Sequence, residues 1–246
     1  MSLRRIEKNK HLGKRCFIIA TGPGLNTVDL SFLKDEITIG MNLILRQKDF
    51  TPDYLCVADS TLFNNHYDEI ITERMIDGFY IVQGGCKMID TYNHVSMGGR
   101  CTSGAGSTCR KVDVDDKYSI HYVYHQEKSG IFQEFFKRIR GSYDNLEMLR
   151  LDEYYIDPGL ENISLYGCTT MDNLAIPVAV YLGCNEIYMI GSDGGRGHFY
   201  DTNSGRRHVE FLHVTKRLDA LGVKLYNCDP SDAFPEVEYR KYGELF

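Results

Sequence analysis

Short, largely apolar runs recur along this 246-residue chain, and patterns typical of helices separate them. The runs are rich in β-branched and aromatic residues: Cys16–Ala20, Ile37–Ile39, Tyr54–Ala58, Phe79–Val82, Glu186–Ile190 and Val223–Tyr226. Strands that are apolar without alternation suit a parallel sheet covered on both faces. The repeated order of strand, helix and strand therefore predicts an α/β fold, a Rossmann-like, doubly wound and mostly parallel sheet with helices on both faces.

Two helices are expected before strands in the second half of the chain. The first spans residues 170–182 and stops at Gly183, a residue type that commonly follows the end of a helix. Pro177 should kink this helix or lie in its first turn. The second spans residues 205–221, with an apolar stripe facing inward, and ends at Gly222.

The length and the 43% of hydrophobic residues are enough for one packed core, so we interpret residues 1–246 as a single domain. The stretch from Gln126 to Pro158 differs, because it is rich in charged residues and tyrosine. We interpret residues 126–165 as an inserted lid or cap segment within the domain. The glycine-rich stretch Gly98–Ser107 is expected to be a loop.

The net charge of −6 disfavours general binding to nucleic acid or to an anionic membrane, since either needs a basic surface. No apolar run approaches the roughly 20 residues that cross a bilayer, and no secretory signal is evident. We therefore expect a cytoplasmic protein. The eight cysteines include no Cys-x-x-Cys pair and are expected to be reduced residues of the core rather than zinc ligands.

The loop after the first strand contains four residues of interest: Thr21, Gly22, Pro23 and Gly24. In open α/β sheets ligands bind outside the carboxyl ends of the strands, where the N-termini of helices present unpaired N–H groups. The two glycines would let the backbone approach a ligand, and a helix after this loop would direct its positive end at an anion. A plain strand-to-helix turn is the alternative.

Polar side chains also follow the next two strands. Asn42 comes after the second strand, and Asp59 and Ser60 come after the third. These groups could hold a ribose or the edge of a base, although each residue type is also a common helix cap. Their joint position at successive strand ends favours a nucleotide-binding site.

A second candidate loop spans residues 191–200, contains four glycines and includes Asp193 and Tyr200. A long loop between packed elements is more often functional than idle, but a flexible surface excursion is the alternative. Arg206, Arg207 and His208 follow, at the start of the last long helix. Cations there oppose the helix dipole unless an anion lies near, and a histidine can act as a general base at neutral pH.

Several of these segments resemble the bacterial sialyltransferases that use CMP-sialic acid in lipo-oligosaccharide synthesis, and the related MptE-like superfamily of pterin diphosphokinases and motility accessory factors. The resemblance spans most of the chain. It rests on Ile18–Leu25, Asn42, Asp59–Ser60 with Leu62–Phe63, Ala179–Tyr188 running into Gly191–Asp193, and Lys224–Pro230.

The resemblance implies roles for individual residues. It assigns the cytidine nucleotide to Thr21, Gly22, Pro23, Asn42 and Asp59. It implies that His208 takes the proton of the acceptor hydroxyl and that Tyr200 is one of two tyrosines that stabilise the departing phosphate. No match to the second tyrosine is evident.

Three functions follow as hypotheses. The first is a glycosyltransferase for surface glycan synthesis, which would use a nucleotide-sugar donor and a glycan acceptor and would require no cofactor. Arg206 or Arg207 would contact the phosphate or the acceptor. The second is Mg²⁺-dependent pyrophosphoryl transfer from ATP to a pterin-like alcohol, with Asp59 and Asp193 on the metal. The third is a nucleotide-binding protein without catalysis. The sequence decides neither whether the protein associates peripherally with a membrane nor whether it forms a homo-oligomer.

Overall fold

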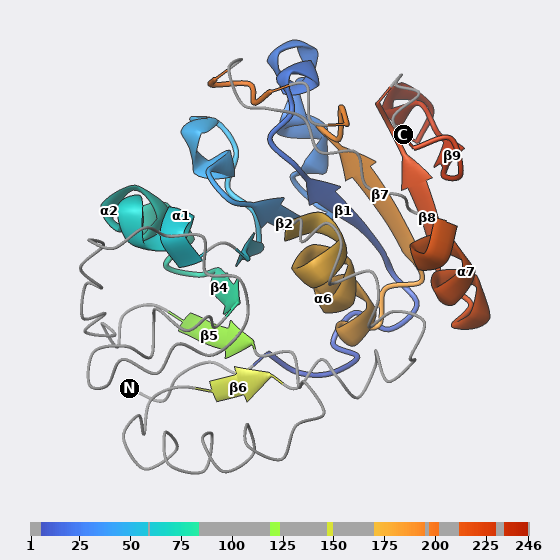
Figure 1. Ribbon diagram of the computed structural model, residues 1–246, viewed down its shortest axis with the longest axis horizontal. Coiled ribbons are helices and arrows are strands. Elements are labelled where there is room, and N and C mark those ends of the chain that lie inside the picture. The colour runs from blue at the N-terminus through green and yellow to red at the C-terminus, as the bar shows by residue number, and fades with distance from the viewer. Residues whose placement is uncertain are drawn as a thin grey trace.

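The computed structural model describes residues 6–58, 60–83, 119–123, 147–149, 170–194, 197–201, 212–229 and 234–245. Within these residues the strands form one sheet in the order β6-β5-β4-β3-β2-β1-β7-β8-β9, and all the pairings are parallel (Figure 1). The strands are β1 (Arg15–Ile19), β2 (Ile37–Met41), β3 (Tyr54–Val57), β4 (Phe79–Gln83), β5 (Ser119–Val123), β6 (Glu147–Leu149), β7 (Glu186–Ile190), β8 (Lys224–Asn227) and β9 (Glu238–Tyr239). The predicted doubly wound parallel sheet is confirmed.

Both faces of the central part of the sheet are buried, which explains why the strands there are largely apolar. On β1, Cys16 and Ile18 belong to one hydrophobic cluster, while Phe17 and Ile19 belong to another. Successive side chains of a strand point to opposite faces, so the two clusters lie on the two sides of the sheet.

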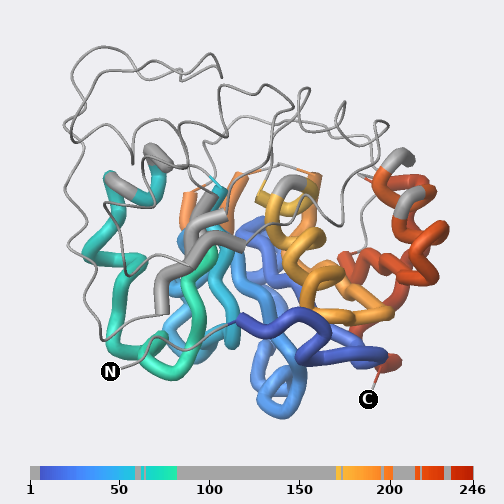
Figure 2. The backbone as a smooth tube through the Cα atoms, turned by 90° about the horizontal axis from the view of Figure 1, so that it is seen from below, coloured from blue at the N-terminus to red at the C-terminus, as the bar shows by residue number. Residues whose placement is uncertain are grey.

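Different kinds of element cover the two faces. The first cluster contains residues of α6 (Ile176–Tyr181) and α7 (Leu212–Ala220). The second contains residues of α1 (Ser60–Asn65), α2 (Tyr67–Ile70) and the 3₁₀ turns η1 (Pro23–Thr27), η2 (Leu30–Leu33), η3 (Ile44–Arg46) and η4 (Glu73–Met75). A last 3₁₀ turn is η6 (Tyr242–Glu244). Figure 2 shows the teal segment with α1 and α2 on one flank, the red C-terminal segment on the other, and the blue strands between them.

The helix expected over residues 170–182 is present in two parts. A π-helical turn, η5 (Met171–Ala175), leads into α6, and Pro177 lies in the first turn of α6 as predicted. Gly183 ends the helix with a φ of 83°, in the left-handed region that favours glycine. Helix α7 likewise ends before Gly222, whose φ is 71°. The expected residues 205–211 of this helix lie outside the described residues.

Three strands were not among the runs picked out from the sequence: β5, β6 and β9. Each contains polar residues or is very short, so none presents a continuous apolar run. Strand β6 lies inside the range interpreted as a lid and pairs with β5. The rest of residues 126–165 and the Gly98–Ser107 loop lie outside the described residues, so the lid stays a prediction.

The thiols of the described part of the chain are buried and unbridged, as expected of reduced core cysteines: Cys16, Cys56, Cys184 and Cys228. Of the helices that the structure describes, none is long and apolar enough to cross a bilayer.

The strand order reverses at β1. Strands β2 to β6 extend to one side of β1, and the chain then returns to place β7 on the other side. In open parallel sheets this switch point is where loops diverge and ligands bind. The loops after β1 and β7 are therefore the first place to examine for a site.

Candidate functional site at the switch point

The loops after β1 and β7 are joined directly to one another. The backbone N–H of Gly22 donates to the carbonyl of Gly191 over 2.8 Å, and the N–H of Gly24 donates to Asp193 Oδ2 over 2.9 Å. Thr21, which lies in the chain between β1 and Gly22, is only 5% exposed. The structure thus brings together four of the predicted site residues, Thr21, Gly22, Gly24 and Asp193, from distant parts of the sequence.

The glycines of the first loop make room for Asp193. A Cβ atom on Gly22 would lie 2.0 Å from Asp193 Oδ2 and 2.4 Å from the carbonyl oxygen of Gly191. A Cβ atom on Gly24 would lie 2.7 Å from Asp193 Oδ1. The sequence suggested that these glycines admit a ligand, and the structure shows that they also admit a carboxylate of the protein itself.

Replacing Gly22 with alanine is expected to lower the free energy of unfolding by about 1–3 kcal/mol, because the backbone carbonyl of Gly191 cannot easily move away. For a domain of this size that is a fall in Tm of roughly 2–4 °C per kcal/mol. Gly243→Ala is the matched control, since a Cβ atom there meets nothing within 4 Å. Equal Tm values for the two variants, measured by calorimetry, would contradict the close packing of Asp193.

The expected helix after the first loop is absent, and that prediction was wrong. Pro23 opens a single 3₁₀ turn, η1, which ends at Thr27, and Val28 is extended with φ −107° and ψ 122°. The Thr27 hydroxyl donates to the carbonyl of Gly24, and Asp29 accepts from Ser31 N–H to start a separate turn. These local hydrogen bonds compete with a continuing helix. An anion here would not meet the N-terminus of an α-helix, and the N–H groups of Gly22 and Gly24 are already bonded to Gly191 and Asp193.

A buried carboxylate that the sequence did not single out holds the second loop. Asp229 follows β8 and accepts hydrogen bonds from the N–H groups of Gly191, over 3.1 Å, and Ser192, over 2.5 Å. The pKa of Asp229 is raised to about 6, because burial and the nearby charge of Asp193 together outweigh the opposing effect of these hydrogen bonds. Asp229 therefore anchors the loop that carries Asp193.

The far end of the second loop folds back onto Thr21. A short turn from His198 to Asp201 is closed by a bridge between these two residues. The N–H of Phe199 donates to the Thr21 carbonyl over 2.8 Å, and His198 Nδ1 lies 2.8 Å from Thr21 Oγ1. This turn places Tyr200, a predicted catalytic residue, beside the first loop.

Tyr200 lies between an imidazole and a guanidinium. The rings of His198 and Tyr200 are stacked at 5.0 Å with an 11° interplanar angle, and the Arg46 guanidinium carbon lies 4.3 Å from the centre of the Tyr200 ring. Burial raises the pKa of Tyr200, whereas the Arg46 cation and a hydrogen bond with the Thr21 side chain lower it. The Tyr200 hydroxyl therefore stays protonated at neutral pH and can donate a hydrogen bond.

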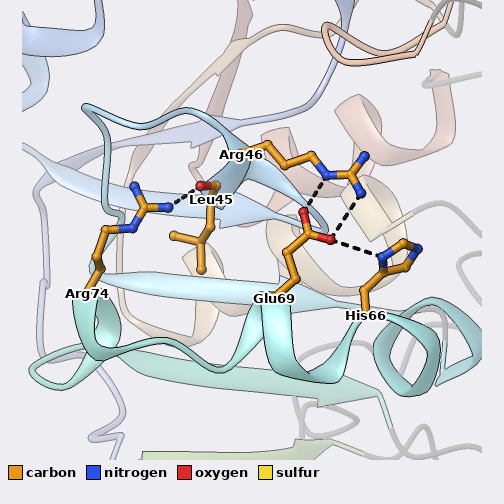
Figure 3. Close-up of polar contacts among 5 residues, drawn as sticks. All are labelled: Leu45, Arg46, His66, Glu69 and Arg74. Atoms are coloured by element: carbon orange, nitrogen blue, oxygen red, sulfur yellow. Dashed lines mark hydrogen bonds and ion pairs between the residues drawn. The ribbon is translucent and has the colours of Figure 1, made fainter.

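Arg46 is paired with Glu69, and Arg74 is bonded to the backbone of the turn that carries Arg46 (Figure 3). The carboxylate of Glu69 in α2 accepts hydrogen bonds from Nε and Nη2 of Arg46, and it also lies 3.1 Å from His66 Nδ1. Arg74 donates to backbone carbonyls at the end of η3, including that of Leu45. Because Arg46 is paired with Glu69 and its guanidinium lies against the Tyr200 ring, we interpret Arg46 as a support for Tyr200.

Asn42 has a structural partner at the end of β2. It adopts a φ of 51°, which asparagine tolerates better than most residues, and its Oδ1 accepts a hydrogen bond from Thr170 Oγ1 over 2.8 Å. This bond ties the strand end to the start of η5. The structure thus places Asn42 at the carboxyl edge of the sheet, with its amide oxygen already engaged.

The other predicted site residues are only partly visible. Ser60 is the first residue of α1, and nothing is described of its side chain. Asp59, Arg206, Arg207 and His208 lie outside the described residues. Four described residues were given no role from the sequence: His198, Arg46, Asp229 and Thr170. His198 does lie in the candidate loop 191–200, and Asp229 lies in the segment Lys224–Pro230 of the resemblance.

The parallel sheet and the joined loops at its switch point define a Rossmann-like α/β protein with its candidate site at the carboxyl edge. Solved structures of sialyltransferases share this fold. Sialyltransferase CstII from Campylobacter jejuni, in complex with cytidine-5'-monophosphate as a substrate analogue, matches 93% of this chain and 85% of its own with a TM-score of 0.54 and 13% identity. Two single-residue variants of sialyltransferase CST-II, each in complex with CMP, match 92% of this chain and 86% of theirs with TM-scores of 0.50 and 15% identity.

At these identities the likeness shows a shared fold. No protein-family model matches the sequence, and no characterised protein matches it closely enough to indicate a common family.

Proposed function

We propose that this protein is a transferase that moves a sugar from a nucleotide-sugar donor to an acceptor hydroxyl, in the synthesis of a surface glycan. The observation that carries the proposal is the junction of the β1 and β7 loops, where Thr21, His198 and Tyr200 meet at the switch point of the sheet. The fold shared with CMP-bound sialyltransferases over most of the chain supports it. The cytoplasm is the expected compartment.

In the proposed reaction the donor nucleotide lies over the loop from Thr21 to Gly24, with Asn42 and Asp59 towards its ribose and base. The acceptor oxygen forms a bond to the anomeric carbon as the bond from that carbon to the phosphate oxygen breaks. The phosphate leaves with the electron pair, and the acceptor proton passes to a base. Because the Tyr200 hydroxyl is protonated, it can donate a hydrogen bond to the leaving phosphate.

The resemblance implies that His208 is the base and that Arg206 or Arg207 contacts the phosphate or the acceptor; these remain predictions. The proposed reaction requires no metal ion or other cofactor. Pyrophosphoryl transfer, the second hypothesis, would require Mg²⁺ bound to the nucleotide phosphates.

Nucleotide binding tests the proposal. In a thermal-shift experiment with CMP, CDP, UDP, GDP and ATP, each with and without Mg²⁺, we expect CMP or another pyrimidine nucleotide to stabilise the protein without metal. A ligand at about 100 times its Kd adds roughly 2.7 kcal/mol. If only ATP together with Mg²⁺ stabilises the protein, pyrophosphoryl transfer is favoured instead. Stabilisation by a nucleotide without turnover of any nucleotide sugar would favour a binding protein.

A further inference from the structure

Thr21, His198, Tyr200 and Arg46 form a continuous set of side chains at the carboxyl end of β1. Nδ1 of His198 is 2.8 Å from Thr21 Oγ1, the His198 ring is stacked on Tyr200, and Tyr200 is stacked under Arg46. The backbone supports the same arrangement, because the N–H of Phe199 is bonded to the Thr21 carbonyl. The imidazole of His198 is therefore fixed in orientation at the predicted nucleotide loop.

One ring nitrogen of His198 is engaged by Thr21. Its ring faces Thr21 through Nδ1, and both the Thr21 hydroxyl and the Thr21 carbonyl contribute hydrogen bonds to it. In one tautomer of the ring Nδ1 carries the hydrogen and donates it to Thr21 Oγ1. The lone pair of the neutral ring is then on Nε2, as in histidines whose Nδ1–H is bonded to a backbone carbonyl.

Burial lowers the pKa of the His198 ring and so keeps it neutral at physiological pH. Burial lowers the pKa of His198 and Arg46 lowers it further, while Asp201 and the Thr21 carbonyl raise it. The net direction is downward from 6.5, so the free base predominates at pH 7. A neutral imidazole with a directed lone pair is suited to accept a proton.

We propose that His198 is the general base of the transferase reaction and takes the acceptor proton on Nε2. This inference rests on the proposed function. As the acceptor oxygen bonds to the anomeric carbon, its O–H bond breaks and the proton moves to Nε2. The electron pair of the broken sugar–phosphate bond leaves with the phosphate. The Thr21 oxygens stabilise the imidazolium that forms, and Tyr200 packs against its ring.

The proposal assigns to His198 the role that the sequence resemblance gives to His208. His198 is a described residue whose ring is held by Thr21 and Tyr200, beside the loop that binds the nucleotide in the proposed function. A purely structural role, in which the ring only closes the turn onto Thr21, is the competing interpretation, and the two differ in what they predict for proton transfer.

The test is nucleotide release from CMP-sialic acid, and from UDP- and GDP-hexoses, with water as the acceptor. We expect His198→Gln to retain the nucleotide-induced thermal shift and to lose roughly 100-fold or more in kcat, since general bases contribute about 10²–10⁴-fold. The acidic limb of the pH profile of kcat should disappear. His198→Asn, which keeps a donor towards Thr21 but has no group at the Nε2 position, should behave in the same way.

His11→Gln is the matched control. His11 is also bonded to a hydroxyl, that of Tyr54, and burial also lowers its pKa, but it lies beside the end of α6 at the opposite edge of the sheet. Its kcat and pH profile should match those of the wild type. Nitrogen-15 spectra of the histidines supply a readout that does not depend on activity: the signal lost in His198→Asn should report a hydrogen on Nδ1.

Three outcomes would overturn the role of His198. These are a kcat within tenfold of the wild type with the acidic limb preserved, loss of nucleotide binding in both variants, and a hydrogen on Nε2 instead of Nδ1. Loss of the acidic limb in His208→Gln alone would return the role to His208. If the wild type itself neither binds nor turns over any nucleotide, the proposed function fails, and the role of His198 fails with it.

Discussion

Replacing Phe17 with alanine is expected to lower the free energy of unfolding by about 3–5 kcal/mol, and replacing the adjacent Ile18 is expected to lower it by about 2–5 kcal/mol. Both side chains are fully buried, but they belong to the two different hydrophobic clusters. Phe17 is stacked on Tyr188 at 5.1 Å, while Ile18 is in the cluster that includes α6. In a sheet with one face exposed to solvent, truncating two adjacent residues would lower the free energy of unfolding strongly at only one of them.

Denaturant unfolding monitored by circular dichroism measures both effects. Tyr239→Ala is the control, because this tyrosine is 50% exposed on the edge strand β9 and its truncation is expected to change stability by roughly 0.5 kcal/mol or less. A large loss at Phe17 with none at Ile18, or the reverse, would mean that one side of β1 is not covered. The doubly wound arrangement would then be wrong.

Replacing Asp229 with alanine is expected to lower the free energy of unfolding by about 2–5 kcal/mol at pH 5, where the side chain is largely protonated. The change leaves two buried N–H groups, those of Gly191 and Ser192, without an acceptor, at about 1–3 kcal/mol each. Asp35→Asn, an exposed carboxylate, is the matched control and should be close to neutral. A loss below about 1 kcal/mol would mean that Asp229 does not anchor the β7 loop.

The pH dependence of stability tests the same residue. Burial raises the pKa of Asp229 from 3.8 to about 6, so protonation favours the folded state. The stabilisation is complete below about pH 4 and is lost as the pH rises through about 6. Relative to Asp229→Asn, the wild type should therefore lose on the order of 2–3 kcal/mol between pH 4 and pH 7. A constant difference between the two proteins would contradict the raised pKa.

The anchoring of the β7 loop links these stability effects to the proposed function. Asp229 holds Gly191 and Ser192, and the following Asp193 accepts from Gly24 in the β1 loop. Loosening Asp229 should therefore also displace the loop that carries His198 and Tyr200. We expect variants at Asp229 to bind nucleotide more weakly even at temperatures well below their Tm.

The central strands and the main helix could be predicted from the sequence because their signals are local. The runs around Ile18, Leu55 and Ile187 are apolar at nearly every position, and a strand buried on both faces requires that composition. Pro177 and Gly183 mark the start and end of α6 through their own backbone preferences. The position of the site also followed, because parallel strands bring their carboxyl ends to one edge of the sheet.

What occupies that edge depends on contacts between distant residues, and only the tertiary structure decided it. The carboxylate of Asp193 fills the space over Gly22 and Gly24, Asp229 holds the β7 loop, and His198 is directed at Thr21 across 177 positions of the chain. The 3₁₀ turn after β1, in place of the expected helix, depends on a few competing local hydrogen bonds. The sequence alone thus determined the layers and the edge at which the candidate site lies, since hydrophobic burial follows local pattern. The tertiary structure decided which polar groups meet there, because hydrogen bonds between loops depend on where the folded strands end.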